Sequence, residues 1–218
     1  MTSLGTGDGT LTIVDYGAGN LHSLAKALAF SGARIRIDDE PRRAVDRSRT
    51  SMLVLPGVGA FSTAAARIAP ARHEMRRAID DGLPVLGVCL GMQLLFDSSE
   101  EGSGAGLSAI PGTVRRLDAT RVPQIGWNTV ERAPNGQRLG DEPLPSVAYY
   151  ANSFVCEPEN EESVIAWSCY EQDRFPAAVR GGPLGNIIGV QFHPEKSSAA
   201  GRRFLHALVA WALETARR

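Results

Sequence analysis

The sequence has no strong charge of either sign, few cysteines and no long apolar run. Its 218 residues carry 23 basic and 24 acidic side chains, giving a formal net charge of −1, so the charge balance does not favour nucleic acid or an anionic membrane as a partner. No apolar stretch approaches the length of a membrane span. The three cysteines, Cys89, Cys156 and Cys169, form no CxxC pair. This spacing argues against a disulfide framework or a metal site and predicts a reduced cytoplasmic protein, and no motif calls for a cofactor.

The length and composition predict one globular domain after a short leader. Hydrophobic residues make up 43% and charged residues 22% of the chain, which is ordinary for a folded α/β domain. The first ten residues, "MTSLGTGDGT", are polar and rich in glycine, and they lack the basic and apolar regions of a signal peptide. We therefore expect a flexible leader over 1–10 and a single domain over 11–217.

Hydrophobic periodicity predicts an α/β fold with an open, mostly parallel central sheet flanked by helices. The first half alternates strand patterns with helical ones, which is typical of a parallel sheet. Its expected strands are 11–15, 34–38, 52–55 and 84–88, and its helices follow them, with one over 62–81 that Pro70 interrupts and a shorter one over 90–96. The second half is denser in strand patterns, so extra antiparallel strands are expected before a final helix with Phe204, Leu208 and Trp211 on one stripe.

One cysteine lies on a predicted sharp turn. Gly87, Val88, Cys89, Leu90 and Gly91 follow a strand and precede a helix, which is the context of a G-x-[Ser/Cys]-x-G nucleophile elbow. The positive end of the helix dipole favours a thiolate there, and the first backbone N–H groups, beginning at Leu90, are suited to stabilising an oxyanion. Most single cysteines are small core residues, but the strand–turn–helix context favours a nucleophile here.

A thiolate nucleophile needs a base, and one of the four histidines is well placed. His193 stands in "GVQFHPEKSS" just after a predicted strand, and Glu195 follows it by two residues. A carboxylate there is able to orient the imidazole and stabilise the imidazolium. Cys89, His193 and Glu195 therefore form a candidate triad at the carboxyl ends of strands, where ligands bind in open α/β sheets. The alternative is a plain turn with a solvated Glu195.

The loop "PGVGAF" (56–61) also follows a predicted strand. Gly57 and Gly59 allow unusual peptide orientations, so the N–H of Val58 is a candidate for completing the oxyanion hole. The alternative is an ordinary turn between a strand and a helix.

Taken together, these motifs resemble class I (triad-type) glutamine amidotransferases over about 11–211. Several segments resemble in particular the glutaminase subunits of imidazole glycerol phosphate synthases: "DYGAGNLHSL", "LPGVGAF", "GVCLGMQLLFDSSEEG", "GLSAIPGTVRRL", "VPQIGWNTV" and "GVQFHPEKSS". The resemblance implies a flavodoxin-like fold and hydrolysis of glutamine through a thioester at Cys89, with His193 transferring protons. It also implies that Gln93, Asn152 and Ser153 belong to the glutamine-binding site.

The resemblance further implies a partner and marks three departures. Such glutaminases dock on a (β/α)₈-barrel cyclase, which receives the ammonia and makes imidazole glycerol phosphate and an aminoimidazole carboxamide ribotide in histidine biosynthesis. Asn20, Trp127, Tyr149 and Lys196 fall where that heterodimer interface is expected, with Lys196 either in an ion pair or simply solvated. The chain departs from the family by having Gln124 and Asn152 where histidines are usual, with Phe154 in place of a tyrosine.

Two other functions stay open on the sequence alone. The first keeps the chemistry but supplies ammonia to amidino-sugar synthesis, as paralogous glutaminases do. The second is a non-catalytic binding module, because "YGAGNLHS" weakly resembles a dinucleotide loop although it lacks the third glycine of G-x-G-x-x-G.

Overall fold

An eight-stranded sheet forms the centre of the protein. We describe a computed structural model that covers residues 9–17, 21–57, 59–134 and 144–216. The strand order is β2-β1-β3-β4-β13-β12-β11-β8, and the first five strands are parallel. The parallel strands are β1 (Thr10–Val14), β2 (Arg34–Asp38), β3 (Met52–Leu55), β4 (Val85–Val88) and β13 (Ile187–Val190). The antiparallel strands are β12 (Asp173–Gly181), β11 (Val164–Tyr170) and β8 (Glu131–Arg132).

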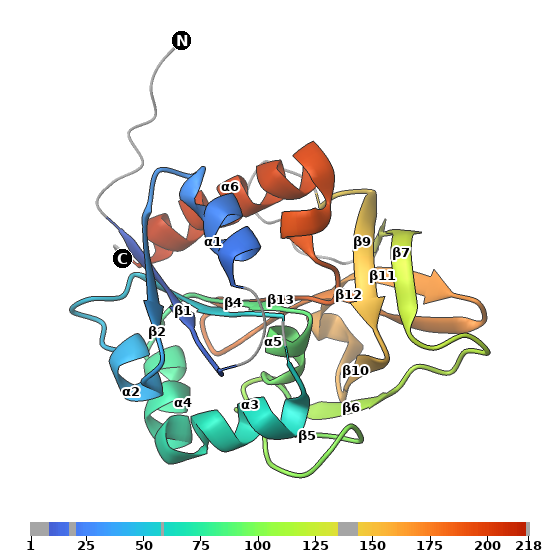
Figure 1. Cartoon of the computed structure of the whole chain (residues 1–218), viewed down its shortest axis with the longest axis horizontal. Helices are drawn as coiled ribbons and strands as arrows, with labels where there is room; N and C mark the ends of the chain where they lie inside the picture. The colour runs from blue at the N-terminus through green and yellow to red at the C-terminus, as the bar shows by residue number, and fades with distance from the viewer. Residues whose placement is uncertain (1–8, 18–20, 58, 135–143, 217–218) are drawn as a thin grey trace.

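Helices cover both faces of the parallel part of this sheet (Figure 1). Helices α1 (His22–Ala29) and α6 (Ser198–Thr215) lie on one face, and α3 (Phe61–Ile68) and α4 (Arg72–Asp80) lie on the other. Every residue of β3, β4 and β13 is buried, because a strand covered on both faces needs a continuous apolar run. The core consequently forms two clusters, one on each side of the sheet.

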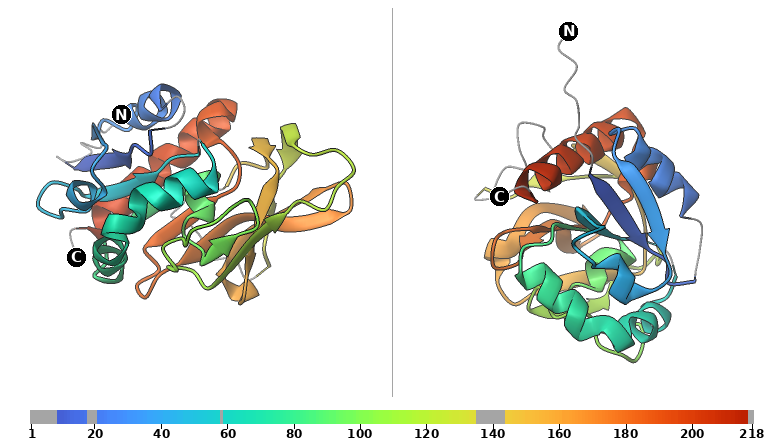
Figure 2. Two further views of the ribbon diagram at one scale, coloured as in Figure 1. Left: turned by 60° about the horizontal axis from the view of Figure 1, so that its bottom comes forward. Right: turned by 90° about the vertical axis from the view of Figure 1, so that its left-hand side faces the viewer.

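Two smaller sheets, built mostly from the second half of the chain, lie beside the helix-covered part (Figure 2). One contains β10 (Phe154–Pro158), β6 (Gly112–Arg116) and β5 (Ser98–Ser99). The other pairs β7 (Gln124–Thr129) with β9 (Val147–Asn152) in antiparallel register. The mixed α/β class with added antiparallel strands is therefore confirmed, while β5, β8, β10 and the short helix α2 (Pro41–Ala44) were not expected.

Pro70 interrupts the helical segment before β4, as predicted. A 3₁₀ turn over Ala69–Ala71 separates α3 from α4, because proline has no N–H to donate and its ring crowds the preceding turn. The prediction for the next helix was too long. Helix α5 covers only Leu90–Gln93, since the carbonyl groups of residues 94–96 accept bonds from the N–H groups of residues 107–110 instead of continuing the helix.

The expected leader lies almost wholly outside the described residues. Strand β1 begins at Thr10, one residue before the predicted domain start. In the described part of the chain, no helix has the length and apolarity needed to cross a membrane. Cys89 and Cys156 are buried free thiols, and Cys169 is an exposed one.

Candidate active site

The cysteine turn has the geometry of a nucleophile elbow. Cys89 follows β4, precedes α5 and has φ 47° and ψ −107°, a conformation that is strained for any residue other than glycine. A Cβ on Gly91 would lie 1.9 Å from the carbonyl oxygen of Leu55, and one on Gly87 would lie 2.6 Å from that of Gly91. Only glycines therefore allow the backbone to pass so closely. The bond from Cys89 N to Val190 O, 2.7 Å long, fixes the turn against β13.

His193 lies between Cys89 and Glu195. Its Nδ1 is 2.8 Å from Glu195 Oε1, and the two side chains are only 5% and 8% exposed. Burial by itself lowers the pKa of His193, but hydrogen bonds with the side chains of Cys89 and Glu195, together with their charges, raise that pKa from 6.5 to about 10. The structure thus brings the predicted triad together, in an arrangement that favours the imidazolium form of His193.

The loop after β3 lies directly on this pair. A Cβ on Gly57 would be 2.8 Å from Val88 O, 3.0 Å from Cys89 Cβ and 3.1 Å from His193 Cε1. No side chain fits at this position. The predicted oxyanion donor, the N–H of Val58, lies outside the described residues, so that role stays a prediction.

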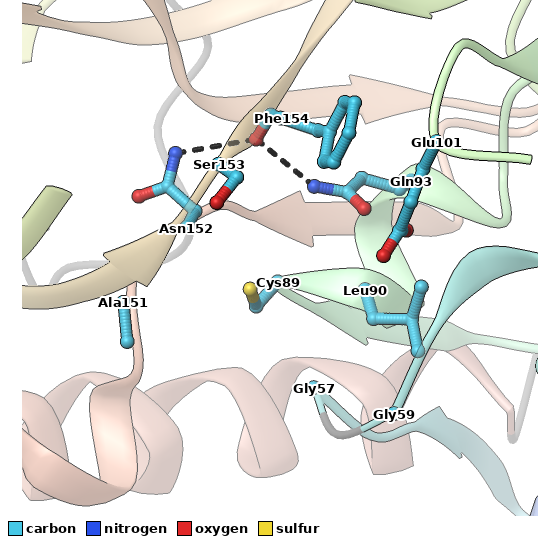
Figure 3. Close-up of a pocket in the computed structure, with 10 residues that line it drawn as sticks. All are labelled: Gly57, Gly59, Cys89, Leu90, Gln93, Glu101, Ala151, Asn152, Ser153 and Phe154. Carbon is cyan, nitrogen blue, oxygen red and sulfur yellow. Dashed lines mark hydrogen bonds between the residues drawn. The ribbon is translucent and has the colours of Figure 1, made fainter. Parts of the chain in front are cut away.

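A cavity of about 200 Å³ opens above the sulfur (Figure 3). Gln93 Nε2 and Asn152 Nδ2 both donate to the carbonyl oxygen of Phe154, at 3.0 and 3.2 Å. Every described residue that was predicted to bind substrate lines this cavity. The lining consists of Gly57, Gly59, Cys89, Leu90, Gln93, Glu101, Ala151, Asn152, Ser153 and Phe154.

Glu101 is a lining residue that the sequence reasoning did not select. Its carboxylate reaches the cavity (Figure 3), and Oε2 accepts a hydrogen bond of 2.9 Å from the backbone N–H of Phe61, the first residue of α3. A helix N-terminus stabilises a negative charge. The only sequence signal was its place in the "FDSSEEG" run, where several acidic residues compete for the role.

With the geometry of the site described, comparison with known proteins decides the family. Residues 12–210 match the family "Glutamine amidotransferase class-I". The "Imidazole glycerol phosphate synthase subunit HisH" of Thermosynechococcus vestitus is 38% identical over 206 residues, which are 92% of this chain and 96% of that protein. The chain belongs to the HisH family of class-I glutamine amidotransferases. A HisH of Symbiobacterium thermophilum is 41% identical over 199 residues, 89% of this chain and 91% of the relative.

A longer relative and the solved structures extend the comparison. "Imidazole glycerol phosphate synthase hisHF, chloroplastic" of Arabidopsis thaliana is 40% identical over 219 residues, which cover 92% of this HisH-family chain but 35% of the plant protein. A crystal structure of a glutamine amidotransferase superimposes with a TM-score of 0.71 at 18% identity, covering 96% of this chain and all of that one. The structure of PurLQS from Thermotoga maritima superimposes with a TM-score of 0.65 at 17% sequence identity. The match covers 96% of this chain and 97% of that one. These two structures show the shared fold.

The predicted partner residues of this HisH-family chain that are described lie on one surface. Trp127 and Tyr149 are cross-strand neighbours in β7 and β9, with their rings edge to face and the centroids 6.1 Å apart. Lys196 Nζ lies 5.8 Å from the Tyr149 ring centroid. Trp127 is 55% exposed, and Ile125 is exposed beside it. We call Trp127, Tyr149 and Lys196 the partner surface; Asn20, also predicted for it, lies outside the described residues.

Backbone contacts connect this surface to the triad. The carbonyl oxygen of Tyr149 accepts a bond of 2.8 Å from His193 N. The hydroxyl of Ser197 donates to His193 O at 2.7 Å and accepts from Tyr149 N at 3.0 Å. A shift of β9 would therefore move His193. Ser197 is a functional candidate that the sequence reasoning missed, because the "EKSS" segment gives no sign of which strand it meets.

Two of the three residues expected to depart from the family pattern lie opposite each other. Gln124 and Asn152 are directly paired in the β7–β9 register, and both are buried. Neither amide titrates near neutral pH. These two expected departures therefore lie at a single place in the structure.

Another cavity of the described residues, of about 520 Å³, lies at the opposite end of the parallel strands. It is lined by the residues at the start of β1 and β2 and just before β3. Its lining consists of Thr10, Arg34, Ile35, Arg36, Arg47, Ser48, Arg49, Thr50 and Ser51. We call it the arginine cavity.

Proposed function

We propose that this chain hydrolyses glutamine to glutamate and ammonia at Cys89 and delivers the ammonia to a (β/α)₈-barrel cyclase subunit. The cyclase would use it to make imidazole glycerol phosphate and aminoimidazole carboxamide ribotide in histidine biosynthesis. The observation that carries the proposal is His193, held between Cys89 and Glu195 at the cavity edge of a HisH-family chain. The free thiols support a reduced, cytoplasmic setting, and the family match over 12–210 supports one amidotransferase domain over 11–217.

The first half-reaction forms the thioester. The Cys89 thiolate attacks the side-chain amide carbon of glutamine, and the oxygen of that amide becomes negative. Backbone N–H groups at Leu90 and in the 57–59 loop are suited to stabilise this oxygen. The C–N bond then breaks as His193 gives its proton to the leaving nitrogen, so ammonia departs. Glu195 holds the imidazole orientation throughout.

The second half-reaction releases glutamate. His193, now neutral, takes a proton from a water molecule, and the water oxygen bonds to the acyl carbon. The C–S bond breaks and the thiolate leaves opposite a protonated His193. The resting ion pair is thereby restored, and one water has been consumed for each ammonia formed.

Glutamine also carries an α-ammonium and an α-carboxylate, and the cavity has a group for the first. The Glu101 carboxylate is suited to pair with the ammonium because charge-assisted hydrogen bonds are the strong ones. Gln93, Asn152 and Ser153 surround the rest of the molecule. The cavity therefore suits a small amide that also carries an ammonium group.

The partner surface is the proposed docking site for the cyclase. An exposed tryptophan edge-on to a tyrosine, with a lysine beside them, has the composition of an interface centre. The Arabidopsis relative named hisHF is a longer chain of which the HisH-like part is about a third. This supports a physical association between the glutaminase and a second unit.

The test is ammonia release from glutamine by the chain alone, with the cyclase, and with the cyclase and its ribotide substrate. We expect release to be highest in the complete mixture. Trp127→Ala should weaken cyclase binding about tenfold in a titration while leaving the fold intact, and Leu184→Ala, an exposed apolar residue outside the partner surface, is the matched control. The proposal fails if the complete mixture releases no more ammonia than a Cys89→Ala mixture.

A further inference from the structure

We infer that Gln191 is a positioning residue that holds the Cys89 sulfur as a thiolate through its side-chain amide. The inference rests on the proposed function, because it concerns the same nucleophile. Gln191 Nε2 donates to Cys89 Sγ at 3.5 Å, and the residue is completely buried. It lies outside the cavity lining and so acts through Cys89 rather than on glutamine.

Strand pairing brings the amide to the sulfur. Strand β13 runs parallel to β4 with Val190 opposite Val88, and Cys89 N bonds to Val190 O at 2.7 Å. Cys89 is the first residue after β4, and Gln191 is the first residue after β13. The strand register therefore places Gln191 beside Cys89. The bond from Gln191 N to Ala177 O, 2.9 Å long, fixes its backbone against β12.

Gln191 and His193 reach the same sulfur from the short segment that follows β13. Gln191 and Phe192 form a bend, and His193 has extended backbone with φ −99° and ψ 95°. One segment thus presents two donors to Cys89: a charged imidazolium and a neutral amide. The amide donates a hydrogen bond to the thiolate. Because the amide is neutral, it does not place a second positive charge beside the imidazolium of His193.

The chemistry favours the anionic sulfur. An amide N–H is a donor, a thiolate is a strong acceptor and a thiol is a weak one, so the contact stabilises the thiolate. Four other titratable groups surround Cys89. His193 and Glu195 lie on the segment that contains Gln191, Glu101 lies across the cavity, and Cys156 belongs to β10. Burial and the proximity of Cys89 raise the pKa of the Cys156 thiol well above its usual value, which keeps that neighbour neutral.

Asn186, at the other end of β13, is a buried side-chain amide with a purely structural role, and it serves as a comparison for Gln191. It is also completely buried, but its Nδ2 donates to the backbone oxygens of Ile79 and Leu83, both at 2.8 Å. Its role is to tie the end of α4 and the following turn to the sheet. The Gln191 amide group makes its side-chain bond to the nucleophile instead. The two amides are a matched pair that flank one strand, β13.

The test measures the alkylation of Cys89 by iodoacetamide across pH, followed on the Cys89 peptide by mass spectrometry in the full chain. Gln191→Met keeps the length of the side chain but removes the donor. It should slow Cys89 alkylation at neutral pH by about tenfold and move the pH midpoint upward. Gln191→Glu replaces the donor with a carboxylate and should move the midpoint further. Asn186→Leu should lower Tm and leave the midpoint unchanged.

Steady-state kinetics with the cyclase give a second readout. Gln191→Met should lower kcat for glutamine hydrolysis with little change in KM, because Gln191 does not line the cavity. A wild-type alkylation midpoint in both folded Gln191 variants would overturn the inference, as would a midpoint shift of the same size in Asn186→Leu. If the wild-type chain with cyclase released no ammonia, the proposed function would fail, while the alkylation series would still decide the role of Gln191.

Discussion

The two cavities at opposite ends of the parallel strands differ in what their walls are able to do. The arginine cavity is the larger, at about 520 against 200 Å³, but its charged side chains are all arginines. One of them, Arg36, is already bonded to Thr50 Oγ1 and Arg43 O. The smaller cavity contains a thiol in strained backbone, a carboxylate and two side-chain amides. Size alone would have pointed to the wrong end of the sheet.

The physical reason lies in the parallel strands themselves. Their carboxyl ends meet at one edge, so the loops after β3, β4 and β13 converge there, which is where open α/β sheets bind ligands. The loop after β3 supplies Gly57, the turn after β4 supplies Cys89, and the segment after β13 supplies His193. The other edge receives the chain as it enters the strands, and two of its arginines are bonded to groups around them: Arg36 to Arg43 O and Thr50 Oγ1, and Arg47 to Asp81 O.

The largest effect should come from removing the sulfur at the smaller cavity. Cys89→Ala should lower glutamine hydrolysis on the order of 10⁴-fold or more, because no thioester forms. Ammonia release with the cyclase present measures this. Cys169→Ala is the control, since Cys169 is an exposed thiol, and it should keep wild-type activity. Equal losses in the two variants would contradict the assignment.

Removing the carboxylate behind the imidazole should have the next largest effect. Glu195→Gln should lower kcat about a thousandfold, because the imidazole loses the group that orients it and balances its charge. The KM for glutamine should change little, since Glu195 is not part of the cavity lining. A kcat within a few-fold of wild type would show that Glu195 is only a turn residue.

The same variant should change the pH dependence of stability. The folded-state pKa of His193 is raised from 6.5 to about 10, so its imidazolium stabilises the fold fully below pH 6.5, and this contribution is lost as the pH rises through 10. The advantage of the wild type over Glu195→Gln in urea unfolding should therefore shrink from pH 6.5 towards pH 10. An advantage that grew over this range would reverse the sign and exclude the ion pair.

A methyl group between the loop and the nucleophile should have a smaller but clear effect. Gly57→Ala places a Cβ about 3 Å from both Cys89 Cβ and His193 Cε1, which pushes the two side chains out of alignment. We expect kcat to fall about a hundredfold, measured with the cyclase at saturating glutamine. Thermal unfolding of the variant serves as the control. Unchanged activity in a folded variant would mean that the loop moves freely away from the nucleophile.

The smallest effect is expected at the arginine cavity. The double variant Arg34→Ser/Arg49→Ser alters two exposed side chains there, and kcat/KM for glutamine should stay within about twofold of wild type. A fall comparable to that of Gly57→Ala would show that the two ends of the sheet are coupled, and it would weaken the distinction between the cavities.

The local parts of the site could be predicted from the sequence. Cys89 between spaced glycines after a strand, and Glu195 two residues after His193, are short-range patterns whose geometry follows from the few residues involved. The alternation of strands and helices in the first half likewise predicted the parallel sheet. The length of α5 was mispredicted because long-range bonds from residues 107–110, rather than helix propensity, end the helix.

The sequence by itself determined the fold class and predicted the nucleophile Cys89 and its base His193, since each of these inferences rests on patterns of residues that are close together along the chain. Only the tertiary structure decided that Glu101, Gln191 and Ser197 meet the same site, and that Gln124 lies opposite Asn152. Their partners are tens of residues away in sequence. Strand register and loop packing bring such residues together, and both are set by burial across the whole domain. A local sequence pattern does not show which distant residues will come into contact.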